Sequence, residues 1–174
     1  MKKPTYIFSV DAETNGLWGQ PFAIGAVVYK DGVEVNRFQA RMPDSVVNNQ
    51  WVKDNVLPAL DMPVTHDHYA TMLASFSKFY LSHKEATTLW HMGHVVESFL
   101  FRECVRLGFL GEWDAPYTPI EVSETLRVTG HDADSVDKYI HAYMIEKPQG
   151  STHDPVFDCI CAFYCWDHLT GLNL

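Results

Sequence analysis

Apolar and polar positions follow two different patterns along this chain of 174 residues, first in short runs and then at helical spacing. Near the start, apolar positions gather in short runs at Tyr6–Ala12, Phe22–Tyr29 and Val33–Met42. Runs of this length that are rich in β-branched and aromatic residues are typical of strands. Lys30-Asp31-Gly32 separates the second run from the third, and Asp-Gly tolerates the positive φ angles of a tight hairpin turn. The opening of the chain therefore predicts an antiparallel meander of three strands.

After the meander, apolar positions recur every three or four residues, a spacing that is typical of helices. The predicted helices cover residues 48–57, 67–82, 95–107, 132–146 and 155–169. Gly108 is expected to end the third of them as a C-cap. Short apolar runs at 86–90 and 119–122 predict a fourth and a fifth strand. Strands that alternate with helices after a meander predict an α/β fold, with a mixed five-stranded sheet and helices on both faces.

Composition narrows the classes of protein that this chain can belong to. Hydrophobic residues make up 47%, which is enough for a sizeable core, and the length suits a single domain over residues 1–174. The net charge of −9 argues against a broad basic surface for long duplexes, because such binding depends largely on neutralising phosphates. The start holds only a brief apolar stretch, and no apolar run reaches membrane-spanning length. We expect a soluble cytoplasmic protein with no membrane partner.

The end of the first predicted strand carries two acidic residues, Asp11 and Glu13. Residues two apart on a strand face the same side, with α-carbons about 6.5–7 Å apart. Two hard oxygen ligands at this spacing can share Mg²⁺ or Mn²⁺. Thr14-Asn15-Gly16 then predicts a turn where backbone can approach a ligand closely. The alternative is an ordinary polar strand end, because Asp-x-Glu on its own is common.

A second candidate group lies at the start of the last predicted helix. Asp154 suits the N-cap position, and Pro155 suits the first helical position. His153 then lies just outside the helix and Asp158 about one turn inside it, so both project from the helix end whose dipole favours an anion. A neutral histidine beside a metal site is suited to act as a general base. The alternative is an exposed loop histidine and a solvated aspartate.

The two groups together carry a resemblance to a known family. Asp-x-Glu-Thr-x-Gly-Leu at residues 11–17, followed by His-x-x-x-x-Asp at 153–158, resembles the DnaQ-like 3′-5′ exonucleases of the histidine-containing (DEDDh) subgroup. The resemblance spans roughly residues 5 to 170 and implies a ribonuclease H-like fold. It also implies two divalent cations, Mg²⁺ or Mn²⁺, which support cleavage of the terminal phosphodiester and release of a nucleoside monophosphate.

The middle motif of that family departs from its usual form here. The family places an aspartate at the start of a helix, and this chain has no aspartate between Asp67 and Asp114. Counting back from the predicted helix end places Glu97 at or beside that position, where it would hold the second ion. Another register would place Gly93 there and leave the position empty. The expected catalytic residues are Asp11, Glu13, Glu97, His153 and Asp158.

The resemblance also assigns roles to these residues and to the substrate contacts. Asp11 would bridge both ions, Glu13 and Asp158 would complete one site, and His153 would take a proton from the attacking water. The expected substrate-binding residues are Thr14, Gly16, Leu17 and Trp18. Thr14 would hold the 3′-terminal nucleotide, and Leu17 would wedge against the terminal bases. Trp18 is a candidate to stack on a base or is a rim aromatic.

A narrower resemblance covers Trp51–Pro58, which looks like a stretch of the small bacterial exoribonucleases that act on adenylate-rich RNA 3′ ends. This stretch includes no candidate catalytic residue, so its resemblance bears on ancestry alone. The leading hypothesis is a two-metal-ion 3′-5′ exonuclease on single-stranded RNA or DNA 3′ ends, with RNA slightly favoured. The alternatives are a proofreading or repair exodeoxyribonuclease and a catalytically weak nucleic-acid-binding module. Glu97 is the reason to keep the last of these, and a homodimer remains possible.

Other chemically capable residues are predicted to be structural. Four cysteines are present, and their spacing suits neither a disulfide framework nor a four-ligand zinc site; they are Cys104, Cys159, Cys161 and Cys165. The scattered histidines His66, His68, His91 and His94 are expected to be structural. A substrate contact remains open for His91 and His94, because both lie close to the middle motif. Asp132-Ala133-Asp134 predicts a loop or a helix cap.

Overall fold

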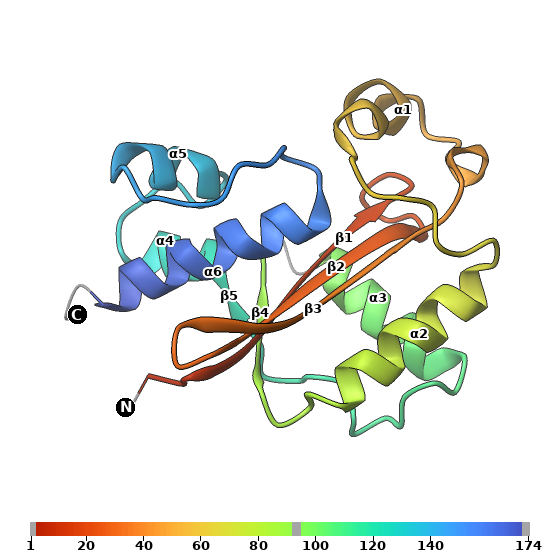
Figure 1. The fold of residues 1–174 in the computed structure, drawn as a ribbon, viewed down its shortest axis with the longest axis horizontal. Helices are drawn as coiled ribbons and strands as arrows, with labels where there is room; N and C mark the ends of the chain where they lie inside the picture. The colour runs from red at the N-terminus through yellow and green to blue at the C-terminus, as the bar shows by residue number, and fades with distance from the viewer. Residues whose placement is uncertain (1–2, 92–94, 172–174) are drawn as a thin grey trace.

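The computed structural model describes residues 3–91 and 95–171 and has one five-stranded sheet, in the order β3-β2-β1-β4-β5 (Figure 1). The strands are β1 (Tyr6–Thr14), β2 (Pro21–Lys30), β3 (Val33–Arg41), β4 (Thr87–Trp90) and β5 (Ile120–Glu121). The first three pair antiparallel, whereas β4 pairs parallel with β1, and β5 pairs parallel with β4. Asp31 and Gly32 both have positive φ angles, as a tight hairpin requires. The predicted meander and mixed sheet are confirmed.

Helices cover both faces of the sheet (Figure 1). They are α1 (Gln50–Asn55), α2 (Tyr69–Leu81), α3 (Val95–Arg106), α4 (Val122–Val128), α5 (Val136–Ala142) and α6 (Pro155–Gly171), with short 3₁₀ turns η1 (Asp44–Val46) and η2 (Leu57–Ala59). One face carries α6, against which α4 and α5 pack, and the other carries α2 and α3. No helix in the described part of the chain is long and apolar enough to span a membrane.

Two predicted helices are shorter than expected, and one helix was not predicted. The helix expected over 48–57 is confined to α1, because Asn49 caps its start and the chain turns into η2 at Leu57. The helix expected over 132–146 shortens to α5, and Met144 just beyond it has a φ of 50°. Helix α4 was not predicted, because its seven residues show one apolar helical pair, Val122 and Leu126, which is too short to establish a period.

Strand β1 divides its side chains between the two faces of the sheet, as alternation requires. Phe8 packs against Phe76 and Tyr80 of α2, with ring centroids 6.4 and 5.3 Å away. Ser9 faces the opposite side, where its hydroxyl donates a hydrogen bond of 2.9 Å to the Cys159 carbonyl of α6. Asp11 lies two residues further along and therefore also faces α6.

Gly25 on β2 allows the start of α6 to lie directly on the sheet. A Cβ at this position would lie 2.4 Å from the carbonyl carbon of Pro155 and 2.5 Å from the Val156 nitrogen. No side chain other than hydrogen fits there. Because Gly25 is the partner of Asp11 in the β1–β2 register, this close approach brings the first turn of α6 beside Asp11.

The four cysteines are unpaired and buried. Burial raises the pKa of the Cys104 thiol to about 11 and those of Cys161 and Cys165 to about 12. These thiols are therefore protonated near neutral pH and pack as small apolar groups.

Candidate active site

Three elements converge on one cluster of potential ligands. Asp11 comes from β1, Asp158 from the first turn of α6, and His91 from the residue directly after β4. Each offers one ligand atom, and these atoms lie within 4.8 Å of one another. Val10 of β1 pairs with Trp90 of β4, so the next residue of each strand, Asp11 and His91, lie side by side. The distance from His91 Nδ1 to Asp11 Oδ1 is 3.6 Å.

The charges of this cluster perturb one another. Burial by itself would lower the pKa of His91, but contact with Asp11 and the charges of Asp158 and Glu97 together outweigh that effect and raise it to about 9. Burial raises the pKa of Asp158 to about 7, although His91 opposes the rise. Buried carboxylates that raise one another's pKa favour binding of a cation, because a cation relieves both the repulsion and the lost hydration.

Glu97 adds a third buried carboxylate, from the first turn of α3. Its side chain is 0% exposed, and neither carboxylate oxygen has a hydrogen-bond partner among the described residues. Burial raises its pKa to about 8, and the charge of Asp11 adds to the rise. A buried polar group without a partner costs free energy. The alternative position for this motif, Gly93, lies outside the described residues.

Glu13 and His153 form a second pair beside the cluster. The distance from His153 Nδ1 to Glu13 Oε1 is 3.4 Å, and the His153 side chain is 41% exposed while that of Glu13 is 14% exposed. Contact with Glu13 raises the pKa of His153, and burial raises the pKa of Glu13. The backbone N–H of His153 donates a hydrogen bond of 2.9 Å to Asp158 Oδ2. His153 therefore contacts Glu13 through its side chain and binds Asp158 through its backbone.

The start of α6 has the predicted geometry. Asp154 Oδ1 accepts hydrogen bonds of 3.0 and 3.2 Å from the backbone N–H groups of Val156 and Phe157, and Pro155 is the first residue of the helix. His153, just outside this cap, has a φ of 69°. That uncommon conformation for a residue with a side chain turns the chain sharply before the helix. It lets His153 and Asp158 face the same point.

Asn15 ties the turn after β1 to the segment that leads into α1. Its Oδ1 accepts hydrogen bonds from the backbone N–H groups of Asn48 and Asn49, at 3.0 and 2.9 Å, and its Nδ2 donates to the Val46 carbonyl at 2.9 Å. Gly16 in this turn has a φ of 83°, and a Cβ there would lie 2.7 Å from Asn49 Nδ2. These contacts hold α1 over the end of β1.

A hollow of about 360 Å³ opens between this turn and α1, beside Glu13. Its lining residues are Ala12, Glu13, Thr14, Gly16, Leu17, Asn49, Trp51, Val52, Val56 and Val96. Three of the four expected substrate-binding residues, Thr14, Gly16 and Leu17, line it. Trp18, 74% exposed, does not line it.

Trp51 joins the hollow to His153. The indole is 60% exposed, and its ring stands perpendicular to the His153 imidazole with centroids 6.0 Å apart. No chemical role was predicted for this stretch from the sequence. The sequence signal that could have found Trp51 is a large aromatic residue in a polar helix turn, two residues after the capping Asn49.

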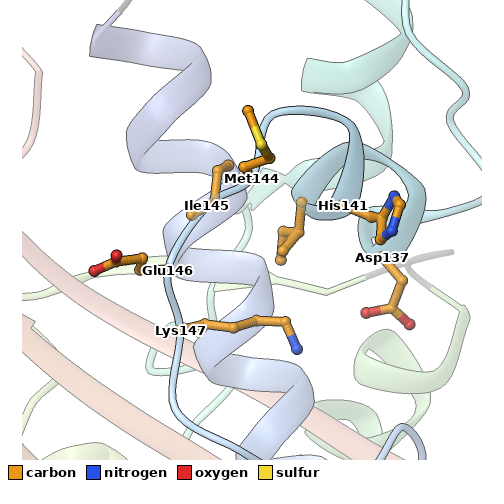
Figure 2. A pocket seen from close by; sticks show the side chains of 7 residues that line it. Asp137, His141, Met144, Ile145, Glu146 and Lys147 are labelled. Atoms are coloured by element: carbon orange, nitrogen blue, oxygen red, sulfur yellow. The ribbon is translucent and has the colours of Figure 1, made fainter.

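A larger hollow of about 660 Å³ lies elsewhere, against α5 and the segment that follows it (Figure 2). Asp137 and His141 project from α5, and Lys147 extends from the following segment along the same hollow. None of its lining residues belongs to the expected catalytic set. The converging carboxylates, rather than hollow size, identify the candidate active site.

The structure thus brings Asp11, Asp158 and His91 together, places Glu97 within electrostatic reach of them, and sets His153 against Glu13. His91 was expected to be structural or a substrate contact, and its place among the carboxylates was missed. The signal that could have found it is its position at the carboxyl end of a strand, where ligands of α/β sheets commonly bind. His94 lies outside the described residues.

Two other groups have the structural roles expected of them. The His66 ring forms hydrogen bonds with the hydroxyls of Thr65 and Ser75. The Asp132 carboxylate accepts a hydrogen bond from the backbone N–H of Asp134 in a turn before α5.

Comparison of the sequence with family models and with curated proteins finds no match. Comparison of the structure finds S. pombe Pop2p in a form with Mg²⁺ and Mn²⁺ bound, with a TM-score of 0.71, 8% identity, and coverage of 96% of this chain and 83% of that one. It also finds Exonuclease X in complex with 5′ overhanging duplex DNA, with a TM-score of 0.64, 17% identity, and coverage of 96% and 92%. At these identities the likeness shows the fold, and the chain has the ribonuclease H-like fold of these two proteins.

Proposed function

We propose that this chain is a two-metal-ion 3′-5′ exonuclease that releases nucleoside 5′-monophosphates from single-stranded 3′ ends. The observation that carries the proposal is the Glu97 carboxylate, which is fully buried, has no hydrogen-bond partner among the described residues, and interacts electrostatically with Asp11 and His91. The shared fold supports it, since one protein with this fold is recorded with Mg²⁺ and Mn²⁺ and the other is an exonuclease bound to DNA.

The donor set fits divalent cations. Asp11, Glu13, Glu97 and Asp158 offer the carboxylate oxygens that Mg²⁺ and Mn²⁺ prefer. A cation would also give Glu97 the partner that the described chain does not provide. When bound in pairs, such ions stabilise both the attacking and the leaving oxygen of a phosphodiester displacement.

His153 is the proposed general base. Because its Nδ1 faces Glu13, Nδ1 carries the proton and Nε2 is left free to accept one. Glu13 thereby favours this tautomer and orientation of the ring, while partial exposure gives a water molecule access to it. A base placed in this way contributes about 10²–10⁴ to the rate.

The hollow beside Glu13 is the proposed site of the 3′-terminal nucleotide. Its volume of about 360 Å³ lies within the usual range for ligand pockets. Thr14 and Gly16 supply polar and backbone contacts, Leu17 supplies the wedge, and Trp51 forms a wall that reaches His153. Trp18 is proposed to contact the strand outside the hollow. The net charge of −9 on the whole chain favours a strand end over a long duplex as the substrate.

RNA is slightly favoured as the substrate, on the weaker resemblance of residues 51–58. An exodeoxyribonuclease or a weakly catalytic binding module is the alternative. A homodimer and a cytoplasmic location remain predictions.

Digestion of oligonucleotides tests the proposal. RNA and DNA strands labelled at the 5′ or the 3′ end are incubated with Mg²⁺, Mn²⁺ or EDTA. Shortening from the 3′ end that requires metal and is lost in Asp11→Asn supports the exonuclease, and the faster substrate identifies the sugar. Asp134→Asn, at an exposed position away from the cluster, is the matched control. If no strand is cut with either metal while the chain still binds oligonucleotides, the binding-module alternative replaces the proposal.

A further inference from the structure

His91 occupies a position that the proposed mechanism does not use. Its side chain is 18% exposed, and its Nδ1 lies 3.6 Å from Asp11 Oδ1. That distance exceeds the range of about 2.7–3.2 Å for an N–H···O hydrogen bond. Two ligands that each lie about 2.1 Å from one ion are separated by roughly 3.0–3.5 Å. The separation is therefore long for a hydrogen bond, and a small movement of either side chain would let both atoms hold one ion.

The surroundings of His91 point to a cation as well. Asp11 and Asp158 complete a set whose ligand atoms lie within 4.8 Å of one another. Glu97, a separate observation from α3, is fully buried, has no partner among the described residues, and interacts electrostatically with both Asp11 and His91. A single imidazolium carries one positive charge, whereas a divalent cation carries two and offers coordination to several carboxylate oxygens at once.

We propose that His91 is a nitrogen ligand of the ion held by Asp11 and Asp158, and that it makes this position selective for a first-row transition ion over Mg²⁺. The proposal rests on the proposed function for the presence of metal and adds the identity of one ligand and the class of ion. Imidazole nitrogen suits transition ions, whereas Mg²⁺ demands oxygen ligands and keeps its water.

The competing role for His91 is that of a protonated counter-ion to Asp11. The two roles predict opposite effects of removing the ring. A ligand contributes to metal affinity, so its removal weakens binding of Mn²⁺. A counter-ion competes with metal for Asp11, so its removal leaves binding unchanged or tightens it.

Pulsed electron paramagnetic resonance of Mn²⁺ bound to the full chain distinguishes these roles without any substrate. We expect nitrogen hyperfine coupling in the native chain, and we expect it to change to a ¹⁵N pattern when histidine is ¹⁵N-labelled. The coupling should persist in His153→Asn, the matched control, and disappear in His91→Asn. Labelling of the native chain keeps the test valid if His91→Asn does not fold.

Calorimetric titration supplies the affinities. His91→Asn should lower the ratio of Mn²⁺ to Mg²⁺ affinity at least tenfold, a loss comparable to the smallest effects of disturbing a metal-ligand environment. Coupling that is absent from the native chain, coupling that survives in His91→Asn, or an unchanged affinity ratio would each overturn the proposal. Nitrogen coupling in a chain that cuts no oligonucleotide would leave this inference standing and remove the proposed function. Metal-dependent cutting without nitrogen coupling would do the reverse.

Discussion

Replacing Glu97 with glutamine removes a buried negative charge while keeping the size of the side chain. The pKa of Glu97 is raised from 4.5 to about 8, mainly by burial. A carboxyl whose folded pKa is raised contributes stability that is fully present below its unfolded pKa and is lost as the pH rises through the folded pKa. The metal-free chain should therefore lose stability between about pH 5 and pH 8.

The magnitude follows from the displacement of that pKa. Each unit corresponds to about 1.4 kcal/mol, so Glu97 alone should lower the free energy of unfolding by on the order of 3 kcal/mol over this interval. Asp158 and His91 have pKa values raised to about 7 and about 9, and both add to the loss in the same direction. In Glu97→Gln the Glu97 contribution disappears and the other two remain.

Urea denaturation in EDTA at several pH values measures this effect. The native chain and Glu97→Gln should be similar at about pH 5, and the variant should be the more stable of the two at about pH 8. Glu112→Gln, which changes an exposed loop carboxylate, should follow the native profile. Adding Mn²⁺ should restore stability to the native chain at high pH, and less so to Glu97→Gln, because ligand binding to the folded state stabilises it. A flat native profile, or equal slopes in both chains, would refute the reasoning.

Three further predictions concern the proposed base, the hollow and the sheet. His153→Asn should lower kcat about 10²–10⁴-fold with little change in the affinity for substrate; single-turnover and binding assays separate the two, and an unchanged kcat would exclude His153 as the base. Trp51→Ala should weaken binding of single strands by about 1–3 kcal/mol if the indole contacts a base, whereas Trp113→Ala, a change at another exposed tryptophan, should leave binding unchanged in fluorescence anisotropy. Gly25→Ala should destabilise the chain by about 1–3 kcal/mol or more, because the new Cβ would lie 2.4 Å from the backbone of Pro155. Gly25→Ala should also weaken Mn²⁺ binding, because it would move Asp158 away from Asp11. If thermal denaturation shows the variant to be as stable as the native chain, the packing argument is wrong.

The parts of the site that could be predicted from sequence are those set by local geometry. Alternation along a strand places Asp11 and Glu13 on one side, and the Asp154-Pro155 cap fixes where α6 begins, so Asp158 follows one turn later. Glu97 could be located by counting back from the glycine that ends α3, and Gly108 does have a φ of 75°. Each of these inferences needs only a few neighbouring residues.

The parts that were missed depend on contacts between distant segments. His91 lies beside Asp11 because β4 pairs with β1 in one particular register, and nothing near His91 in the sequence specifies that register. Trp51 reaches His153 because Asn15 holds the start of α1 over the end of β1. The role of Gly25 likewise appears only once α6 is seen to pack against it.

Hydrolysis in ¹⁸O-labelled water tests the central claim most directly. With Mn²⁺ and a single-stranded oligonucleotide, mass spectrometry should find nucleoside 5′-monophosphates that carry one ¹⁸O on phosphorus, released in order from the 3′ end and absent in Asp11→Asn. That result would show that water attacks the terminal phosphodiester and that the acidic cluster is required. Products with 3′-phosphates, release from the 5′ end, or phosphate without ¹⁸O would contradict the account.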